Sequence, residues 1–247
     1  MKSLPLAMFI LLLLAVLTVP ATVEAQPQHD KAPKITFPDV PGYRTLKVDL
    51  HMHTVFSDGN VWPKIRVLEA VREGLDAIAV TDHIEYLPHR DDIPLPDRNR
   101  SFDIASKVAH AVDSTLIIIS GSEITRKLPP GHANAIFLKD INPIVQDSAL
   151  DAYREADKQG AFTFWNHPSW VGQQKDGIAE LTDLHRELID EGLLHGIEVA
   201  TMHDYSEVAL QIALDNNMTI LGTSDIHDLS DWEFEHDHFG HRPITLV

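Results

Sequence analysis

Two histidines, His51 and His53, stand one residue apart at the end of an alternating apolar run, and Asp58 follows in the next few residues. Side chains at positions i and i+2 leave the same face of a strand, so both imidazoles can bind one cation, and Asp58 can reach back from the loop. Imidazole nitrogen together with carboxylate oxygen suits divalent transition metals. The pair alone is about as often structural as metal-binding, so by itself it indicates only a candidate site.

Histidine or carboxylate side chains recur at the ends of the other apolar runs. Glu123 follows a strongly apolar run, where a carboxylate costs free energy unless it is paired or bound to a metal. Asp225 and His227 repeat the i, i+2 spacing. The carboxyl ends of parallel strands meet on one rim, so the recurrence predicts a shared metal site. The candidates at run ends are His51, His53, His83, Glu123, His132, His167, His203, Asp225 and His227.

Short apolar runs alternate with segments of helical period along most of the chain. The expected strands cover residues 48–53, 76–83, 116–123, 132–138, 161–167, 196–204, 219–227 and 243–247. The expected helices cover residues 61–74, 101–112, 149–160, 179–192 and 205–216. This alternation predicts an α/β fold with a parallel sheet, either open and doubly wound or closed into a barrel. No glycine-rich loop follows the first run, which weakens the dinucleotide-binding version.

The N-terminal residues have the pattern of an export signal. Lys2 precedes an apolar run, and small residues around Ala25 suit cleavage, so residues 1–25 predict a signal peptide and a periplasmic or extracellular location. The run is short for a membrane span, so none is expected after cleavage, although an uncleaved anchor is the alternative. Residues 26–44 predict a proline-rich linker, and 45–247 a single domain. The domain ends inside an apolar run, which suggests truncation at the C-terminus.

Composition narrows the functional classes. The chain has 247 residues, 44% of them hydrophobic, which is enough for a sizeable core. It holds 37 acidic against 20 basic residues, and the net charge of −17 argues against nucleic acid as a partner. Without cysteine, any metal must be held by nitrogen and oxygen ligands. Of the 15 histidines, five are interpreted as solvated: His29, His89, His110, His185 and His195.

Six motifs in order identify a family resemblance. HMHTVFSDG, AVTDH, GSE, GHANAIF, NHP and SDIH resemble the PHP (polymerase and histidinol phosphatase) superfamily, over roughly Lys47 to Val247. The resemblance implies a distorted (β/α)7-type, TIM-like barrel with a metal site at the C-terminal ends of its strands. It also implies up to about three divalent ions, drawn from Zn²⁺, Mn²⁺ and Fe.

The resemblance further implies which residues hold each ion. A first ion would be held by His51, His53, Glu123 and Asp225, a second by Glu123, His132 and His167, and a third by Asp58, His83 and His227. Asp58 stands where some members have histidine, which leaves the third ion's identity open. His203 matches no ligand position. Three dications against three carboxylates leave a positive field that suits a phosphate ester.

The expected activity is hydrolysis of a small phosphomonoester by a hydroxide that bridges two ions. Asp225 or His227 would move the proton to the leaving group. Candidate phosphate contacts are Arg126, Lys127, Arg90, Arg98 and Arg100, although the last three lie in a loop that is equally compatible with simple solvation. Trp165 and Trp170 could line the pocket or belong to the core.

Two other interpretations stay open. Amidohydrolase barrels, which cleave carbon–nitrogen bonds, also carry HxH on their first strand, but they usually place a lysine on a middle strand, where this chain has Glu123. A non-catalytic, exported metal-binding module would hold ions in closed coordination. A nuclease role is disfavoured by the signal peptide and the charge. The sequence specifies neither the substrate beyond a small phosphorylated molecule nor the oligomeric state.

Overall fold

A computed structural model gives the structure of the chain and describes residues 34–112, 115–202, 204–234 and 240–247. The predicted signal peptide, the first part of the predicted linker, His29 and His203 lie outside the described residues. The chain divides into two units, Met1–Lys31 and Ala32–Val247, and every element named below belongs to the second. Residues 34–44 form neither helix nor strand. Among the described residues, no helix has both the length and the apolar character to cross a membrane.

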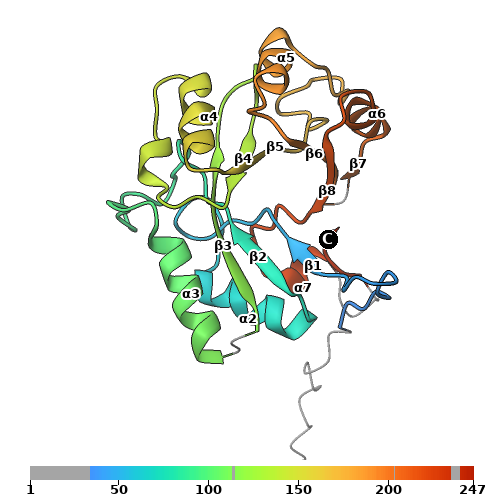
Figure 1. Ribbon diagram of the computed structural model, residues 1–247. Helices are drawn as coiled ribbons and strands as arrows, with labels where there is room; N and C mark the ends of the chain where they lie inside the picture. Colours follow the sequence, from blue (N-terminus) through green and yellow to red (C-terminus); the bar gives the residue numbers. More distant parts are fainter. Residues whose placement is uncertain (1–33, 113–114, 203, 235–239) are drawn as a thin grey trace, which may run out of the picture. The chain divides into compact units, whose positions relative to one another are not determined.

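The strands form one mixed, curled sheet, and seven of them make up most of it (Figure 1). They are β1 (Lys47–Asp49), β2 (Ala77–Val80), β3 (Ile117–Ile124), β4 (Ala133–Ile136), β5 (Phe162–Trp165), β6 (Gly196–Thr201) and β8 (Thr219–Thr223). Two short strands extend the sheet: β7 (Asp204–Tyr205) pairs antiparallel with β6, and β9 (Thr245–Leu246) pairs antiparallel with β1.

The curl closes between β8 and β1. β8 pairs in parallel with β6, and beyond its end Ile226 forms a parallel bridge with Met52. Two backbone hydrogen bonds reinforce the bridge, from the His53 amide to the Ile226 carbonyl (3.0 Å) and from the Asp225 amide to the His51 carbonyl (3.0 Å). The closure therefore joins the two segments that carry most of the candidate ligands. The predicted distorted barrel is confirmed.

The direction of β4 differs from the all-parallel sheet that the sequence pattern predicts. β4 runs antiparallel to both β3 and β5. The connection from β3 to β4, residues 125–132, contains no helix, and it is shorter than the crossover that parallel strands require. Because of this reversal, His132, which precedes its strand, lies on the same rim as residues that follow the other strands.

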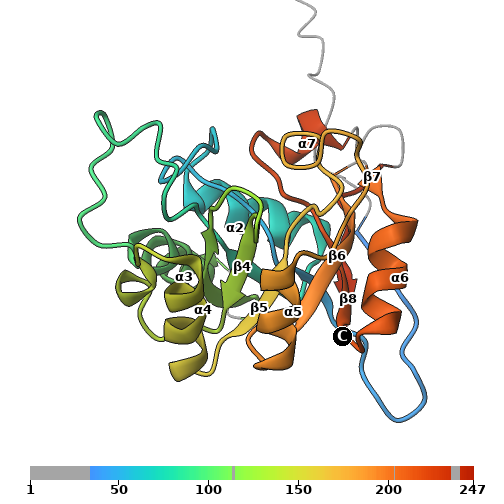
Figure 2. The ribbon, with the colours of Figure 1, turned by 90° about the horizontal axis from the view of Figure 1, so that it is seen from above.

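Helices lie outside the curl of strands (Figures 1 and 2). The five longer ones were expected: α2 (Pro63–Glu73), α3 (Arg100–Val112), α4 (Ala149–Lys158), α5 (Asp183–Asp190) and α6 (Glu207–Asp215). Ser148, Thr182 and Ser206 begin three of them, each accepting a hydrogen bond from a backbone amide three residues later. The short α7 (Ser230–Glu233) and the 3-10 helix Asn142–Ile144 were not predicted, because so few residues show no helical period.

The hydrophobic core has an inner and an outer part. The inner cluster draws residues from β1, β2, β3, β4, β5 and β8, among them Val48, Ala79 and Phe164. Two larger clusters pack the outer face of the strands against the helices. Trp165 belongs to one of these outer clusters, so it is a core residue rather than a wall of the site. These apolar contacts hold the helices and strands together, and the polar side chains at the rim are not part of them.

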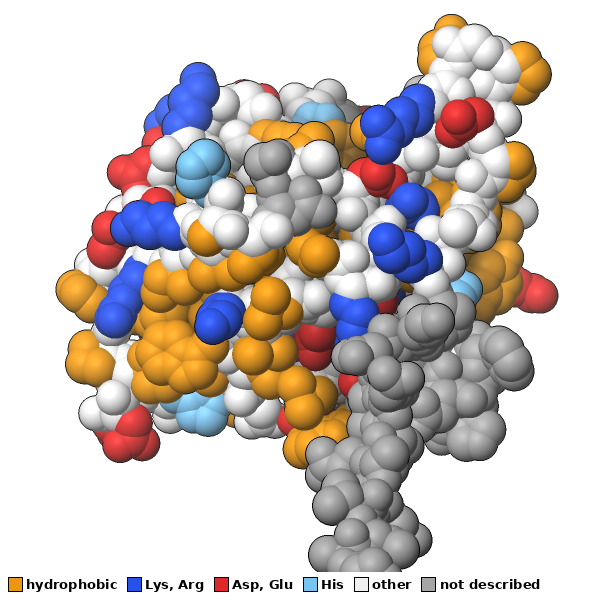
Figure 3. Space-filling view, turned by 90° about the horizontal axis from the view of Figure 1, so that it is seen from below, with side chains coloured by type: hydrophobic (Ala, Val, Ile, Leu, Met, Phe, Trp, Pro, Cys, Tyr) orange, Lys and Arg blue, Asp and Glu red, His pale blue; other side chains and the backbone are white. Residues whose placement is uncertain are grey.

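One face of the molecule carries a broad area of hydrophobic side chains with charged side chains of both signs around it (Figure 3). The acidic excess of the chain therefore does not form a continuous surface on that face. Part of the excess is internal, since Asp49 and Glu73 are fully buried.

His185 is buried, and its interpretation as a solvated histidine is wrong. It occupies the first turn of α5 in a capping box with Thr182, its Nε2 lies 2.6 Å from the Pro130 carbonyl oxygen, and its ring stacks on Trp165 at 3.9 Å. Burial is the main cause that lowers the pKa of His185, to about 4. Its contacts with Trp165, in β5, and with the Pro130 carbonyl account for the burial, which the local sequence pattern does not indicate.

Acid should destabilise the fold partly through His185. Its pKa in the folded chain lies below the ordinary value of 6.5, so its contribution is fully present above pH 6.5 and is lost as the pH falls toward 4. The full loss is roughly 3 kcal/mol. In His185→Gln, the free energy of unfolding measured with urea should therefore fall less between these pH values than in the wild type. His110→Gln, at an exposed position on α3, is the control, and equal slopes in all three proteins would contradict the prediction.

Candidate metal centre

Four predicted ligands converge where β1, β3 and β8 end. Asp225 Oδ1 lies 3.1 Å from His51 Nε2 and 3.1 Å from His53 Nε2, and the two nitrogens lie 3.1 Å apart. Glu123 Oε2 is 3.7 Å from the first nitrogen and 3.4 Å from the second. Four ligands at about 2.1 Å from a tetrahedral ion would lie about 3.4 Å from one another. The spacing of these atoms therefore matches the shell of a single ion.

The other oxygen of Glu123 faces a second group. Glu123 Oε1 lies 2.9 Å from His132 Nδ1 and 3.5 Å from His167 Nε2. His83 Nδ1 also approaches this carboxylate, at 2.6 Å from Oε2. His83, Glu123 and His132 can contribute ligand atoms that all lie within 4.8 Å of one another. Glu123 thus stands between two groups of imidazoles, in a bridging position.

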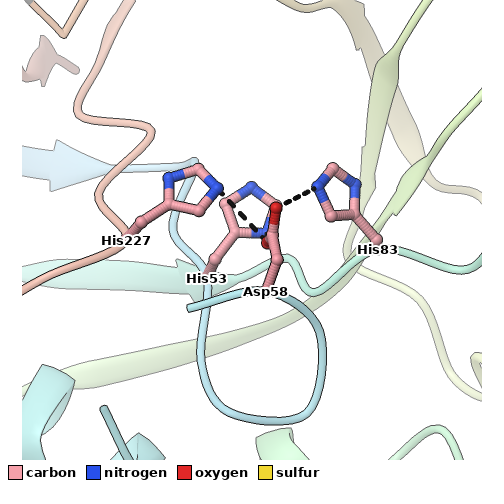
Figure 4. A group of neighbouring side chains, drawn as sticks. All are labelled: His53, Asp58, His83 and His227. Carbon is pink, nitrogen blue, oxygen red and sulfur yellow. Dashed lines mark ion pairs between the residues drawn. The ribbon is translucent and has the colours of Figure 1, made fainter. Parts of the chain in front are cut away.

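Asp58 organises a third group (Figure 4). It rises from the loop after β1 and lies between two imidazoles, with Oδ2 3.3 Å from His83 Nε2 and Oδ1 3.3 Å from His227 Nε2. His53 joins this group through Nδ1, 3.5 Å from Asp58 Oδ1. His227 Nδ1 lies 2.7 Å from the Asp225 carbonyl oxygen, so a proton on Nδ1 leaves the Nε2 lone pair free for a ligand.

All residues predicted as metal ligands therefore lie in one contiguous cluster, although their coordination of ions remains a proposal. Four buried atoms of the cluster make no hydrogen bond: Asp58 Oδ1, Glu123 Oε2, His132 Nδ1 and His167 Nδ1. Buried polar atoms without partners are costly, and cations held by the three ligand groups would satisfy the first three of these atoms. Nitrogen and oxygen donors without thiolate suit Zn²⁺, Mn²⁺ or Fe²⁺. The residues present fit divalent ions.

Carboxylates and imidazoles shift each other's pKa strongly within the cluster. Burial raises the pKa of Asp58, but the neighbouring imidazoles of His227 and His83 outweigh it and hold that pKa well below its usual value. Burial lowers the pKa of His83, but the charge of Glu123 outweighs it and raises the value to about 10. For His227, Asp58 and Asp225 likewise outweigh burial and raise the pKa to about 9. When no ion is bound, positively charged imidazolium groups thus balance the negative charge of the carboxylates.

His53 behaves in the opposite way. Burial is the largest cause that lowers its pKa, to about 3, and the neighbouring charges of His83 and His227 add to the effect. The pKa of Glu123 is held well below its usual value, because the charge of His83 outweighs burial. His53 is therefore neutral, with one ring nitrogen available to a cation, while Glu123 is ionised.

Two residues of the cluster adopt left-handed backbone conformations that glycine usually takes. Asp225 has φ 48° and His167 has φ 30°. Each such residue costs about 1–3 kcal/mol and persists only where its surroundings hold it in place. The Asp225 amide is held by the His51 carbonyl at 3.0 Å, and the His167 amide by the Glu198 side chain at 2.6 Å. The strain lies where the chain must turn sharply to direct side chains to the cluster.

Several residues that support the cluster were not identified from the sequence. Glu198, in β6, is 1% exposed and contacts His51 and His167. The available signal was a glutamate inside the apolar run GIEVA. Asp82 is also buried, and it accepts hydrogen bonds from Thr54 and Ser57 in the loop that carries Asp58.

Two buried arginines stabilise the strand ends through hydrogen bonds. Arg66, on α2, donates to the backbone carbonyls of His53 (2.9 Å), Ile226 (3.2 Å) and Asp228 (2.6 Å). It therefore ties the β1 segment to the β8 segment. Arg242 donates to Asp49 and Glu73 at 3.0 and 2.8 Å. Asp49 in turn accepts hydrogen bonds from Ser224, next to Asp225, so both arginines help to fix the ligand-bearing backbone.

A pocket of about 300 Å³ opens beside the cluster. Its lining combines cluster residues with an apolar and hydroxyl wall: Asp58, His83, His132, His167, Pro168, Ser169, Trp170, Glu198, Val199, Thr201, Met202, Asp204, Ser206, Asp225, His227 and Glu233. Trp170 lines this pocket, which is one of the two positions that the sequence suggested for it. Among the described residues that line the pocket, there is no lysine or arginine.

None of the five predicted phosphate contacts is among those lining residues. Arg126 pairs with Glu85 at 2.8 Å and donates to the carbonyls of Gln146 and Asp147. Lys127 is exposed on the loop that leads to His132.

Arg90 and Arg98 lie in the long loop before α3, and Arg100 is the first residue of that helix. Arg90 pairs with Asp91 at 3.8 Å, Arg98 is part of the turn against Asn142, and Arg100 lies over the Phe56 ring at 5.1 Å. Their role toward substrate stays a prediction without a contact to support it.

Comparison with known proteins gives a family match over most of the domain. The family model described as PHP domain matches residues 49–226. No curated protein matches the chain. A solved structure of a two-domain protein from Bacteroides vulgatus, described as containing a predicted PHP-like metal-dependent phosphoesterase, is 52% identical with a TM-score of 0.84. The match covers 87% of this chain and 62% of that one, so this chain spans less than two thirds of the Bacteroides protein.

Two more distant structures share the fold alone. A candidate metal-dependent phosphoesterase from Bifidobacterium adolescentis is 17% identical with a TM-score of 0.56, over 74% of this chain and 88% of that one. An amidohydrolase from Chromobacterium violaceum is 15% identical with a TM-score of 0.51, over 73% and 87%. At such identities the likeness says nothing about the reaction.

Proposed function

Because this chain belongs to the PHP domain family, we propose that it is a metal-dependent phosphoesterase that hydrolyses a small phosphomonoester. The observation that carries the proposal is the position of Glu123, whose two carboxylate oxygens face two groups of imidazoles beside an open pocket. Two neighbouring ions on one bridging carboxylate are a common arrangement for hydrolysis of phosphate esters.

In this proposal three ligand groups hold the ions, with Asp58, Glu123 and Asp225 supplying the negative charge. Bound ions would lower the pKa of a water ligand and draw charge from the phosphoryl oxygens. Zinc, manganese and iron all remain compatible with the donor set. Asp225 and His227 both line the pocket, so we assign to one of them the transfer of a proton to the leaving group: Asp225 through its second carboxylate oxygen, or His227 when its Nε2 holds no ion.

The pocket lining supports a small substrate. Its 300 Å³ volume accommodates a phosphoryl group with a modest organic part. Because the described lining offers no lysine or arginine, the negative charge of the ester would be countered by the ions. A substrate with several phosphates would meet the lining carboxylates Asp204 and Glu233. We also propose that the enzyme acts outside the cytoplasm, on the strength of its N-terminal sequence alone.

Release of inorganic phosphate from an aryl phosphate tests the proposal. The purified full chain, supplied in turn with Mn²⁺, Zn²⁺ and Fe²⁺, should release phosphate, and His51→Ala should lower the rate by about 100-fold or more. His110→Ala, on the exposed side of α3, should keep the wild-type rate.

The same assay separates the alternatives. Hydrolysis of amide substrates without phosphate release would favour the amidohydrolase interpretation. Bound metal without hydrolysis of either class would indicate a binding module.

A further inference from the structure

Glu198 is a buried carboxylate to which the proposed reaction gives no role. It lies in β6 with 1% exposure, between Ile197 (0% exposed) and Val199 (5% exposed). An ionised carboxylate in such surroundings is costly unless donors satisfy it. The residues that satisfy Glu198 therefore show what it does.

One oxygen of Glu198 is directed at the first ligand group. Glu198 Oε1 lies 2.7 Å from His51 Nδ1 and accepts a hydrogen bond from Thr223 Oγ1 at 2.6 Å. An ionised carboxylate only accepts hydrogen bonds, so the proton of the His51 ring is placed on Nδ1. The lone pair on His51 Nε2 is then free for the first ion, which would lie between it and Asp225 Oδ1, 3.1 Å away.

The other oxygen is directed at the second ligand group. Glu198 Oε2 accepts a hydrogen bond from the backbone amide of His167 at 2.6 Å. His167 has a left-handed backbone conformation, and this hydrogen bond holds that turn. The turn brings His167 Nε2 to 3.5 Å from Glu123 Oε1.

We propose that Glu198 is a positioning residue that orients His51 for the first ion and His167 for the second, and so sets the affinity of both sites. The inference rests on the proposed function, because it assumes that the cluster binds ions. It adds a second physical link between the two sites, besides the bridging Glu123. Loss of a hydrogen-bonded carboxylate behind a ligand histidine costs about 10-fold to 100-fold in metal affinity.

Glu198→Gln is a sharp test, because glutamine keeps the volume but offers a single acceptor oxygen. Its amide nitrogen must face either His51 Nδ1 or the backbone amide of His167. At that position two N–H donors would then face each other. Zinc affinity, measured by competition with a chromophoric chelator, should fall by about 10-fold or more. In nitrogen-15 spectra of the zinc-loaded full chain, the His51 ring should lose its single Nδ1-protonated form.

Ile197→Val is the matched control for a general loss of stability. It changes the neighbouring residue of β6, which belongs to an outer core cluster, and leaves the cluster of ligands untouched. It should lower the melting temperature while leaving zinc affinity and the His51 spectrum as in the wild type. Glu198→Asp, whose carboxylate is retained on a shorter arm, should recover part of the affinity.

The outcomes separate this inference from the proposed function. If Glu198→Gln binds zinc as tightly as the wild type and keeps the His51 spectrum, the positioning role is refuted even though the site binds metal. If Ile197→Val loses zinc affinity to the same extent as Glu198→Gln, the effect is only structural, and the inference is refuted as well. If neither the wild type nor His51→Ala binds zinc measurably, the proposed function itself fails.

Discussion

Replacing Glu123 by glutamine should lower the rate of phosphate release by about 10³-fold, which corresponds to about 4 kcal/mol of transition-state stabilisation. The same variant should lose the first and second ions together. Glu123 Oε2 faces His53 Nε2 at 3.4 Å, and Oε1 faces His132 Nδ1 at 2.9 Å, so a single side chain serves both groups. Glutamine would turn an amide donor toward one cation and would remove the negative charge that both share. The measurement is metal content per chain together with kcat.

Glu85→Gln provides the matched control. Glu85 is a nearby carboxylate that pairs with Arg126 at 2.8 Å and accepts a hydrogen bond from the Thr125 amide at 2.7 Å, but it belongs to none of the ligand groups. The same chemical change there should leave the metal content and the rate within about twofold of the wild type. A Glu123→Gln protein that retains both ions and a tenth of the activity would show that Glu123 does not bridge them.

The ligands could be predicted because their signal is local. Apart from Asp58, which lies in a loop, and His132, which precedes its run, each candidate follows an apolar run, and a barrel brings such ends to one rim. His132 marks the limit of this rule: it precedes its strand, and it reaches the same rim only because β4 runs in the opposite direction to the one predicted. The strand-end pattern alone therefore did not give a physical reason for its place in the cluster.

The supporting residues could not be predicted in this way, because burial depends on what packs over a residue. Glu198 and His185 have ordinary sequence neighbours, and only the assembled barrel shows that one contacts His51 and the other stacks on Trp165. Arg126 shows the converse. Its position after Glu123 suggested a phosphate contact, but its guanidinium pairs with Glu85 and donates to two backbone carbonyls, and it is not among the residues that line the pocket.

Removing the ions should reverse how stability depends on pH between neutral and alkaline conditions. In the ion-free chain the pKa of His83 is about 10 and that of His227 is about 9, both above the ordinary 6.5. Their contribution to stability is therefore fully present below pH 6.5 and is lost as the pH rises through 9 and 10. The pKa values of Asp58 and Glu123 are lowered, so their contribution is present above their ordinary values of 3.8 and 4.5 and is lost in acid. Ion-free protein should thus become less stable from pH 6.5 upward.

Bound ions change the sign of this dependence, because a cation replaces the protons that the imidazoles hold. Metal binding must displace protons from His83 and His227, so affinity should rise with pH over the range in which the ion-free chain weakens. An ion present at about 1,000 times its dissociation constant adds about 4 kcal/mol to the free energy of unfolding. The difference in melting temperature between manganese-loaded and chelator-treated protein should therefore be small near pH 6 and large near pH 8.5. Calorimetric titrations in buffers of different ionisation enthalpy should show protons released on binding. A difference in melting temperature that shrinks with rising pH, or binding without proton release, would mean that these imidazoles do not hold the ions.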